Sequence, residues 1–236
     1  MARKKQLREL RKGTVINATS KQQEKDVIKA LKTVEAELKD RYDVVLHHRK
    51  RWYLHRIAED LNASFPDVEF QSEQKRTFMT PDGGVLSIQD DSDNTYPILI
   101  SEVKNQGTND LRIKEGKDKQ AMGNAIERLG KNVIGIRTAL LKESICPFVC
   151  FGYGYDFHEG STIRDRVVTI ARFGYLNETY LHNEGPNGHI DRGSFYFRRE
   201  RWEPEEMAEI MTDIAERSIL YYFSKYKKEA FLSRSA

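Results

Sequence analysis

The amino-acid sequence predicts a single mixed α/β domain, and three features support this fold class. Segments with the helical period alternate with strand-like apolar runs, in the order helix, strands, helix, strands, helix. The 236 residues are enough to bury one large core. The composition, with 39% hydrophobic and 32% charged residues, is that of a globular chain. We therefore expect residues 1–236 to form one domain, with a basic and mobile N-terminal arm over residues 1–18.

Four segments carry the helical pattern. In the first of them, apolar residues recur at spacings of four, three and four along one face, at Val27, Leu31, Val34 and Leu38. Pro204 suits the first turn of the last segment, where a missing backbone N–H costs nothing. The expected helices are Ser20–Arg41, Tyr53–Asn62, Ala125–Glu143 and Pro204–Tyr226. The expected strands are Lys75–Met79, Val85–Gln89, Tyr96–Lys104, Phe148–Tyr153, Val167–Phe173 and Ser194–Arg198.

Charge and composition exclude several classes of protein. No stretch approaches the roughly 18 apolar residues of a membrane span, and the N-terminus has no apolar signal segment, so we expect a cytoplasmic protein without a membrane partner. Cys146 and Cys150 lack a second pair for a zinc site and are expected to be ordinary buried thiols. We expect no nucleotide cofactor.

Two basic runs, "MARKKQLRELRKG" and "HHRKRW", are prominent in a chain whose net charge is only +3. They indicate either contacts with a polyanion or, more simply, a solvated tail and a solvated helix face.

The stretch from Thr80 to Gly107 combines an acidic turn with a charged strand end. Asp82 lies in a Pro-Asp-Gly-Gly turn, and Glu102 and Lys104 project from the same face of the following strand because they are two residues apart. If the hairpin returns Asp82 to Glu102, the two carboxylates need a cation between them, and Mg²⁺ prefers such oxygen ligands. The lysine would orient water and offset charge on a reacting phosphate. Alternatively, these are an ordinary hairpin turn and an edge-protecting strand end.

The segment "KDKQAMGNAIERLGKN", residues 117–132, predicts the start of a helix. Asn124 as N-cap with Glu127 three residues later would make a capping box, after a flexible entry at Gly123. The same residue types also match the edge of adenine, since Asn pairs bidentately with it, Glu accepts from an exocyclic amine and Arg donates.

Three motifs in this order make the chain resemble the EcoRI-like type II restriction endonucleases of the PD-(D/E)xK superfamily. They are "PDGG" at 81–84, "SEVKNQG" at 101–107 and "GNAIER" at 123–128. The resemblance implies a restriction-endonuclease-like fold with a central mixed five-stranded sheet flanked by helices. It also implies a homodimeric, Mg²⁺-dependent enzyme that cuts double-stranded DNA at a palindromic site with an AATT core.

The resemblance also assigns expected roles to individual residues. Asp82, Glu102 and Lys104 fall on the catalytic positions, and Asp82, Glu102 and the Val103 carbonyl on the metal ligands. The DNA-binding positions are Gln106, Gln120, Ala121, Met122, Gly123, Asn124, Ala125, Glu127 and Arg128. The segment Gln120–Met122 departs from the family pattern at residues that help to read the outer base pair, so we expect a different or relaxed flanking preference. The alternatives are a non-cleaving DNA-binding protein on the same scaffold and a structure-selective nuclease of this fold.

Overall fold

The computed structural model describes residues 14–71, 74–105, 116, 123–154, 157 and 194–232, without the side chains of 14–21 and 123–128. A five-stranded sheet lies at its centre, in the order β1-β4-β5-β6-β7. The antiparallel strands β1, β4 and β5 are followed by the parallel strands β6 and β7, so the sheet is mixed, as predicted. The strands are β1 (Leu46–Arg49), β4 (Val85–Gln89), β5 (Thr95–Asn105), β6 (Phe148–Tyr153) and β7 (Ser194–Arg198).

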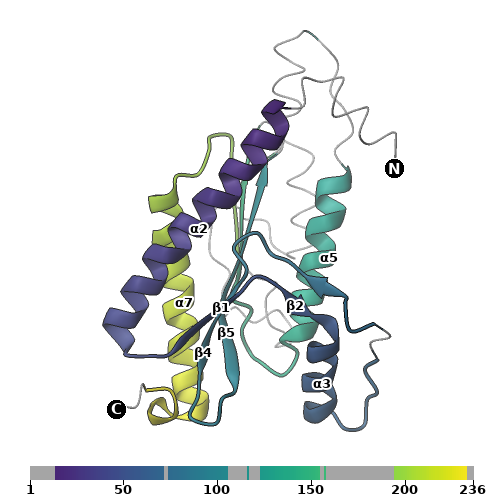
Figure 1. Cartoon of the computed structure of the whole chain (residues 1–236), viewed down its shortest axis with the longest axis vertical. Coiled ribbons are helices and arrows are strands. Elements are labelled where there is room, and N and C mark those ends of the chain that lie inside the picture. Colours follow the sequence, from purple (N-terminus) through teal and green to yellow (C-terminus); the bar gives the residue numbers. More distant parts are fainter. Residues whose placement is uncertain are drawn as a thin grey trace, which may run out of the picture.

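Helices cover both faces of the sheet (Figure 1). On one face, α2 (Thr14–Tyr42) and α7 (Pro204–Tyr226) pack side by side over a core that includes Val103. On the other face, α3 (Leu54–Ser64) and α5 (Gly123–Ala139) enclose a second core that includes Ile100 and Cys150. A small sheet of β2 (Trp52–Tyr53) and β3 (Phe78–Met79) lies beside α3, and the 3-10 helix η2 (Lys228–Ala230) follows α7.

The connection from β5 through α5 to β6 determines where α5 begins. Because β5 and β6 are parallel, the helix between them returns along the sheet, and its N-terminus lies at the carboxyl end of β5. Successive residues of β5 face opposite cores, so Val103 belongs to the α2–α7 side while Ile100 and Glu102 face α5. This alternation confirms the predicted orientation of the strand end.

Most of the expected elements occur where the sequence predicts them. The strands Val85–Gln89, Phe148–Tyr153 and Ser194–Arg198 and the helix Pro204–Tyr226 match in both bounds, and Pro204 occupies the first turn. The expected helix Tyr53–Asn62 is α3, and the expected strands Tyr96–Lys104 and Lys75–Met79 are β5 and the much shorter β3. The expected strand Val167–Phe173 lies outside the described residues.

Two helices differ from the sequence-based expectation by more than two residues at one end. Helix α2 begins at Thr14 rather than Ser20, inside the segment for which we expected an arm. Helix α5 ends at Ala139 rather than Glu143, because the Glu143 carboxylate turns into a buried cluster with α7, where it accepts hydrogen bonds from Tyr221, Lys225 and Tyr226.

Of the two alternatives for "HHRKRW", the solvated helix face does not hold, because the segment forms a strand. His47, His48 and Arg49 lie in β1, the edge strand that pairs with β4. The segment has no apolar alternation of its own, so its strand conformation depends on long-range pairing with β4 rather than on local propensity.

Cys146 and Cys150 are both buried, as expected. Among the helices of the described residues, none has the length and apolar character needed to cross a membrane.

Candidate active site

The turn that carries Asp82 is fixed on both sides by backbone contacts. Gly84 N–H donates to the Pro81 carbonyl at 2.9 Å and closes the turn, and Gly83 N–H donates to the Ser101 carbonyl of β5 at 2.9 Å. On the side of β1, His48 Nε2 donates to the Gly83 carbonyl at 2.8 Å. The turn is therefore held between the edge strand and the central strand.

Glycine is required at position 84, the second of the two glycines in this turn. Gly84 has a φ of +75°, and a Cβ there would lie 2.6 Å from the Arg49 carbonyl oxygen and 2.6 Å from His48 Nε2. The left-handed conformation and the close approach of β1 both exclude a side chain.

Asp82 and Glu102 are joined by reciprocal hydrogen bonds. Asp82 N–H donates to Glu102 Oε2 at 3.1 Å, and Val103 N–H donates to Asp82 Oδ2 at 3.0 Å. Each carboxylate thus accepts a backbone donor from the other's segment. The structure brings the two acids together as the hairpin predicted.

Lys104 supplies the positive charge between the two carboxylates. Its Nζ is 3.5 Å from Asp82 Oδ2 and also pairs with Glu102 Oε1. Burial acts to lower the pKa of Lys104, but the two carboxylates outweigh it and raise the pKa overall. The lysine therefore stays charged at the end of the strand.

Glu102 is the more buried of the two acids, with only 2% of its side chain exposed. Burial, followed by the adjacent charge of Asp82, raises the pKa of Glu102, while Lys104 opposes the shift. A second cation at this position would favour the ionised form further.

Asn132 of α5 completes the surroundings of Glu102, because its Nδ2 donates to Glu102 Oε1 at 3.1 Å. The sequence analysis did not assign this residue a role. A helical projection could have indicated it, since Asn132 is one turn before the buried Ile136 and adjacent to the buried Val133.

The donor set fits a hard divalent cation. Two carboxylates converge on one ammonium group, and the Val103 carbonyl belongs to the same strand end. Over the described residues, no group of three His, Cys, Asp or Glu side chains gathers as a complete metal site. A cation here would consequently keep several ligand positions for water or phosphate.

The remaining site residues predicted from sequence fall in two groups. Gln106, Gln120, Ala121 and Met122 lie outside the described residues. The backbone of residues 123–128 forms the first turns of α5, so Asn124 lies inside the helix rather than at its cap. These first turns of α5 lie at the carboxyl end of β5, the same edge of the sheet as Lys104.

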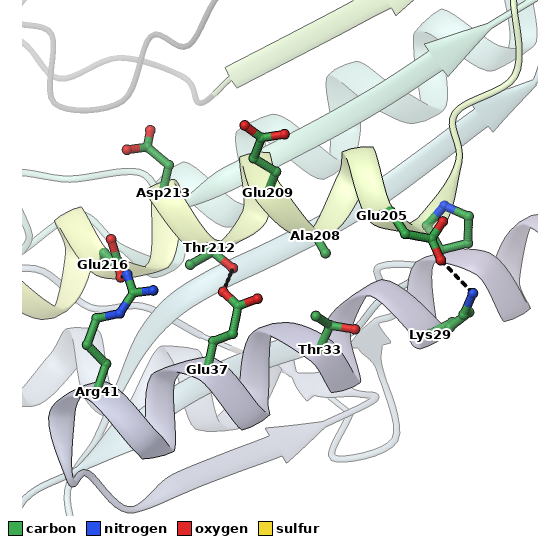
Figure 2. A pocket seen from close by; sticks show the side chains of 11 residues that line it. Lys29, Thr33, Glu37, Arg41, Glu205, Ala208, Glu209, Thr212, Asp213 and Glu216 are labelled. Carbon is green, nitrogen blue, oxygen red and sulfur yellow. Dashed lines mark hydrogen bonds and ion pairs between the residues drawn. The ribbon is translucent and has the colours of Figure 1, made fainter.

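The opposite face of the molecule carries an acidic groove between α2 and α7 (Figure 2). A Lys29–Glu205 ion pair of 2.7 Å and a hydrogen bond from Thr212 to Glu37 join the two helices across it. The ionisable lining residues are Lys29, Arg41, Glu37, Glu205, Glu209, Asp213 and Glu216. This excess of carboxylates repels a polyanion, so the site side of the sheet is the face suited to nucleic acid.

The chain matches the family model described as restriction endonuclease EcoRI over residues 11–229. It belongs to the EcoRI restriction endonuclease family. The type II restriction enzyme RsrI of Cereibacter sphaeroides is 28% identical over 76% of this chain and 84% of its own length. The type II restriction enzyme EcoRI of Escherichia coli is 29% identical over 69% of this chain and 72% of its own length.

Membership of the EcoRI family confirms the enzyme class and fold expected from the motifs. The protein is a site-specific deoxyribonuclease with a restriction-endonuclease-like fold. Enzymes of this family generally use divalent metal ions, which agrees with the oxygen donors at the strand end.

Replacing Gly84 by Ala should displace the catalytic turn. The methyl group meets the Arg49 carbonyl oxygen, and a positive φ costs an alanine about 1–2 kcal/mol. A 1 Å shift of a reacting group can cost about 100-fold in rate, so we expect DNA cleavage to fall by about that factor. Gly135→Ala in α5 is the matched control, because there only the flexible Met79 side chain must move. Equal activity of both variants in a plasmid-cleavage time course would contradict a positional role for the turn.

Asn132 should act by donating its hydrogen bond rather than by filling space. Asn132→Asp keeps the shape but presents a carboxylate to Glu102, whereas Asn132→Ala removes the group. Groups that hydrogen-bond a metal ligand are typically worth about 10–100-fold, so we expect both variants to lose cleavage by such a factor and to need more metal. Thr138→Ala, at an exposed position of the same helix, is the control. Normal metal dependence in the Asp variant would eliminate the donor role.

Proposed function

We propose that this protein is a type II restriction endonuclease that hydrolyses double-stranded DNA at a palindromic site with an AATT core. The observation that supports this best is the convergence of Asp82, Glu102 and Lys104 at the edge of the sheet where α5 begins. These three side chains and the first turns of α5 can then contact the same stretch of duplex, the former at a phosphate and the latter at the base edges.

In this proposal, Asp82, Glu102 and the Val103 carbonyl hold Mg²⁺, which when bound supplies Lewis-acid stabilisation of charge on the scissile phosphate. The reciprocal hydrogen bonds fix both carboxylates before substrate arrives, so no reorganisation is needed at the moment of reaction. Lys104 stays protonated beside them and donates to the phosphate oxygens as their charge increases.

Base reading is proposed for the segment before and at the start of α5. Asn124, Glu127 and Arg128 have side chains that match adenine edges, and Gly123 and Ala125 leave room for close approach of the backbone. Gln106, Gln120, Ala121 and Met122 complete the proposed contacts. Because α5 is anchored to Glu102 through Asn132, the reading segment has a defined position relative to the scissile phosphate.

A palindromic site has a two-fold axis, and we propose a homodimer whose axis coincides with it. The exposed apolar side chains in and just after α5 support this assembly. Ile134 in α5 is 69% exposed, and Leu141, in the turn that follows this helix, is 46% exposed. Leu220, near the end of α7, is 54% exposed and is a further candidate for the interface. We place the enzyme in the cytoplasm, where the thiols of its buried cysteines remain reduced.

Removing any of the three catalytic side chains should abolish cleavage while DNA binding persists. We expect Asp82→Ala, Glu102→Ala and Lys104→Ala each to lose about 100-fold or more of the cleavage rate in Mg²⁺, measured on plasmid DNA. Ca²⁺ should support binding without cutting, because it accepts the same oxygen ligands with looser geometry. Asp213→Ala, a carboxylate deletion in the α2–α7 groove, should behave as wild type. Substantial cutting by the Glu102→Ala protein would disprove the assignment.

The cleaved sites should share a central AATT. Each bidentate base contact contributes roughly 1–3 kcal/mol of discrimination, so one inner substitution in both half-sites should suppress cutting by orders of magnitude. We expect the flanking pair to be relaxed or different from G·C because of Gln120 and Met122. Sequencing the ends of a digested genomic library measures both features. Ends without AATT would refute the base-reading roles, and strict GAATTC would refute only the flanking expectation.

A further inference from the structure

Arg49 lies in line with the catalytic residues across the sheet. It is the last residue of β1 and pairs with Val85, which pairs in turn with Ile100, two residues before Glu102. With neighbouring strands about 4.8 Å apart and a rise of about 3.3 Å per residue, roughly 12 Å separate the Cα atoms of Arg49 and Glu102. The side chain of Arg49 lies over Trp52, which shares a core with Val85 and Ile100, so it is on the catalytic face.

The Arg49 guanidinium contacts an aromatic ring, and no counter-ion for it is found among the residues that the structure describes. It lies 5.0 Å from the centre of the buried Trp52 ring. Its Nε is buried and has no hydrogen-bond partner, and no carboxylate of the described chain forms an ion pair with the group. Burial lowers the pKa of Arg49, and the charge of Asp60 offsets this only in part.

A half-buried, unpaired guanidinium costs free energy that an anionic partner would restore. The neighbouring sequence adds positive charge, since Lys50 and Arg51 are exposed and the Arg51 guanidinium lies 4.6 Å from the Phe78 ring. Arginine forks match the geometry of phosphate oxygens and bind them bidentately.

We propose that Arg49 binds a backbone phosphate of the duplex next to the scissile phosphate. This inference rests on the proposed function and adds to it a specific phosphate contact for one residue of the basic run HHRKRW. Each strand advances about 3.4 Å along the duplex axis per nucleotide, so a phosphate a few nucleotides from the cut lies within reach of the arginine. Arg49 then positions the strand over Asp82 and Glu102 without contributing to base choice.

The test is the salt dependence of DNA binding in the absence of metal. Neutralising one phosphate contact reduces the slope of log K against log salt concentration by about 0.9. Because each protomer of the proposed homodimer carries one Arg49, we expect Arg49→Gln to lower the slope by about twice this amount, on AATT-containing and unrelated duplexes alike. The matched control is Arg56→Gln, which removes the same charge from α3 but from a residue already paired with Glu59 at 2.9 Å. An unchanged slope for a folded Arg49→Gln protein, or an equal reduction for Arg56→Gln, would overturn the proposal.

A second measurement uses duplexes with one neutral methylphosphonate at successive positions near the cut. We expect one position at which the methylphosphonate weakens binding by the wild-type protein but not by Arg49→Gln. The variant has already lost the contact that the modification removes. Additive losses at every position contradict a direct contact. If Arg49→Gln does not fold, the methylphosphonate series with wild-type protein tests the proposal by itself. Equal binding at all positions flanking the cut then overturns it.

The outcome is separable from that of the proposed function. A wild-type protein that binds DNA but fails to cut in Mg²⁺ would refute the nuclease assignment while leaving the phosphate site testable by its salt slope. Cleavage at AATT with an unchanged slope in Arg49→Gln would refute only the phosphate site.

Discussion

The reciprocal hydrogen bonds between the Asp82 turn and the end of β5 are the constraint on which the rest of the site depends. The neighbouring carboxylates of Asp82 and Glu102 repel each other. They stay together because each accepts a hydrogen bond from a backbone N–H of the other's segment and both contact Lys104. The backbone donors come from a turn and a strand, so their positions do not depend on side-chain rotamers. A metal ion would enter an arrangement that is already formed.

The surrounding fold restricts this arrangement from three directions. The edge strand β1 approaches the turn so closely that only glycine fits at position 84, and His48 donates to the Gly83 carbonyl. Helix α5 reaches Glu102 through Asn132. The parallel connection to β6 places the start of α5 at the same sheet edge. In the proposed function, hydrolysis and base reading are therefore joined by one helix, and a displacement of that helix would be transmitted to Glu102 through Asn132.

The distribution of charge divides the molecule into two functionally different faces. Carboxylates line the groove between α2 and α7, whereas Arg49, Lys50 and Arg51 extend from the strand beside the catalytic turn. The small net charge of +3 conceals this separation, because the two sets largely cancel in the total. An approaching duplex would be oriented by the difference between the faces rather than by the overall charge.

The family motifs, the buried strands and the final helix could be predicted from the sequence. Short-range periodicity specifies these elements, and the alternation at Glu102 and Lys104 specifies which side chains share a face. The folded structure was needed to show that His47–Arg49 form a strand, that Asn132 bonds to Glu102 and that, among the described residues, Arg49 has no counter-ion. These features depend on contacts between residues far apart in the chain. A local sequence pattern cannot indicate such contacts, because each residue meets its contact partner only when the chain folds.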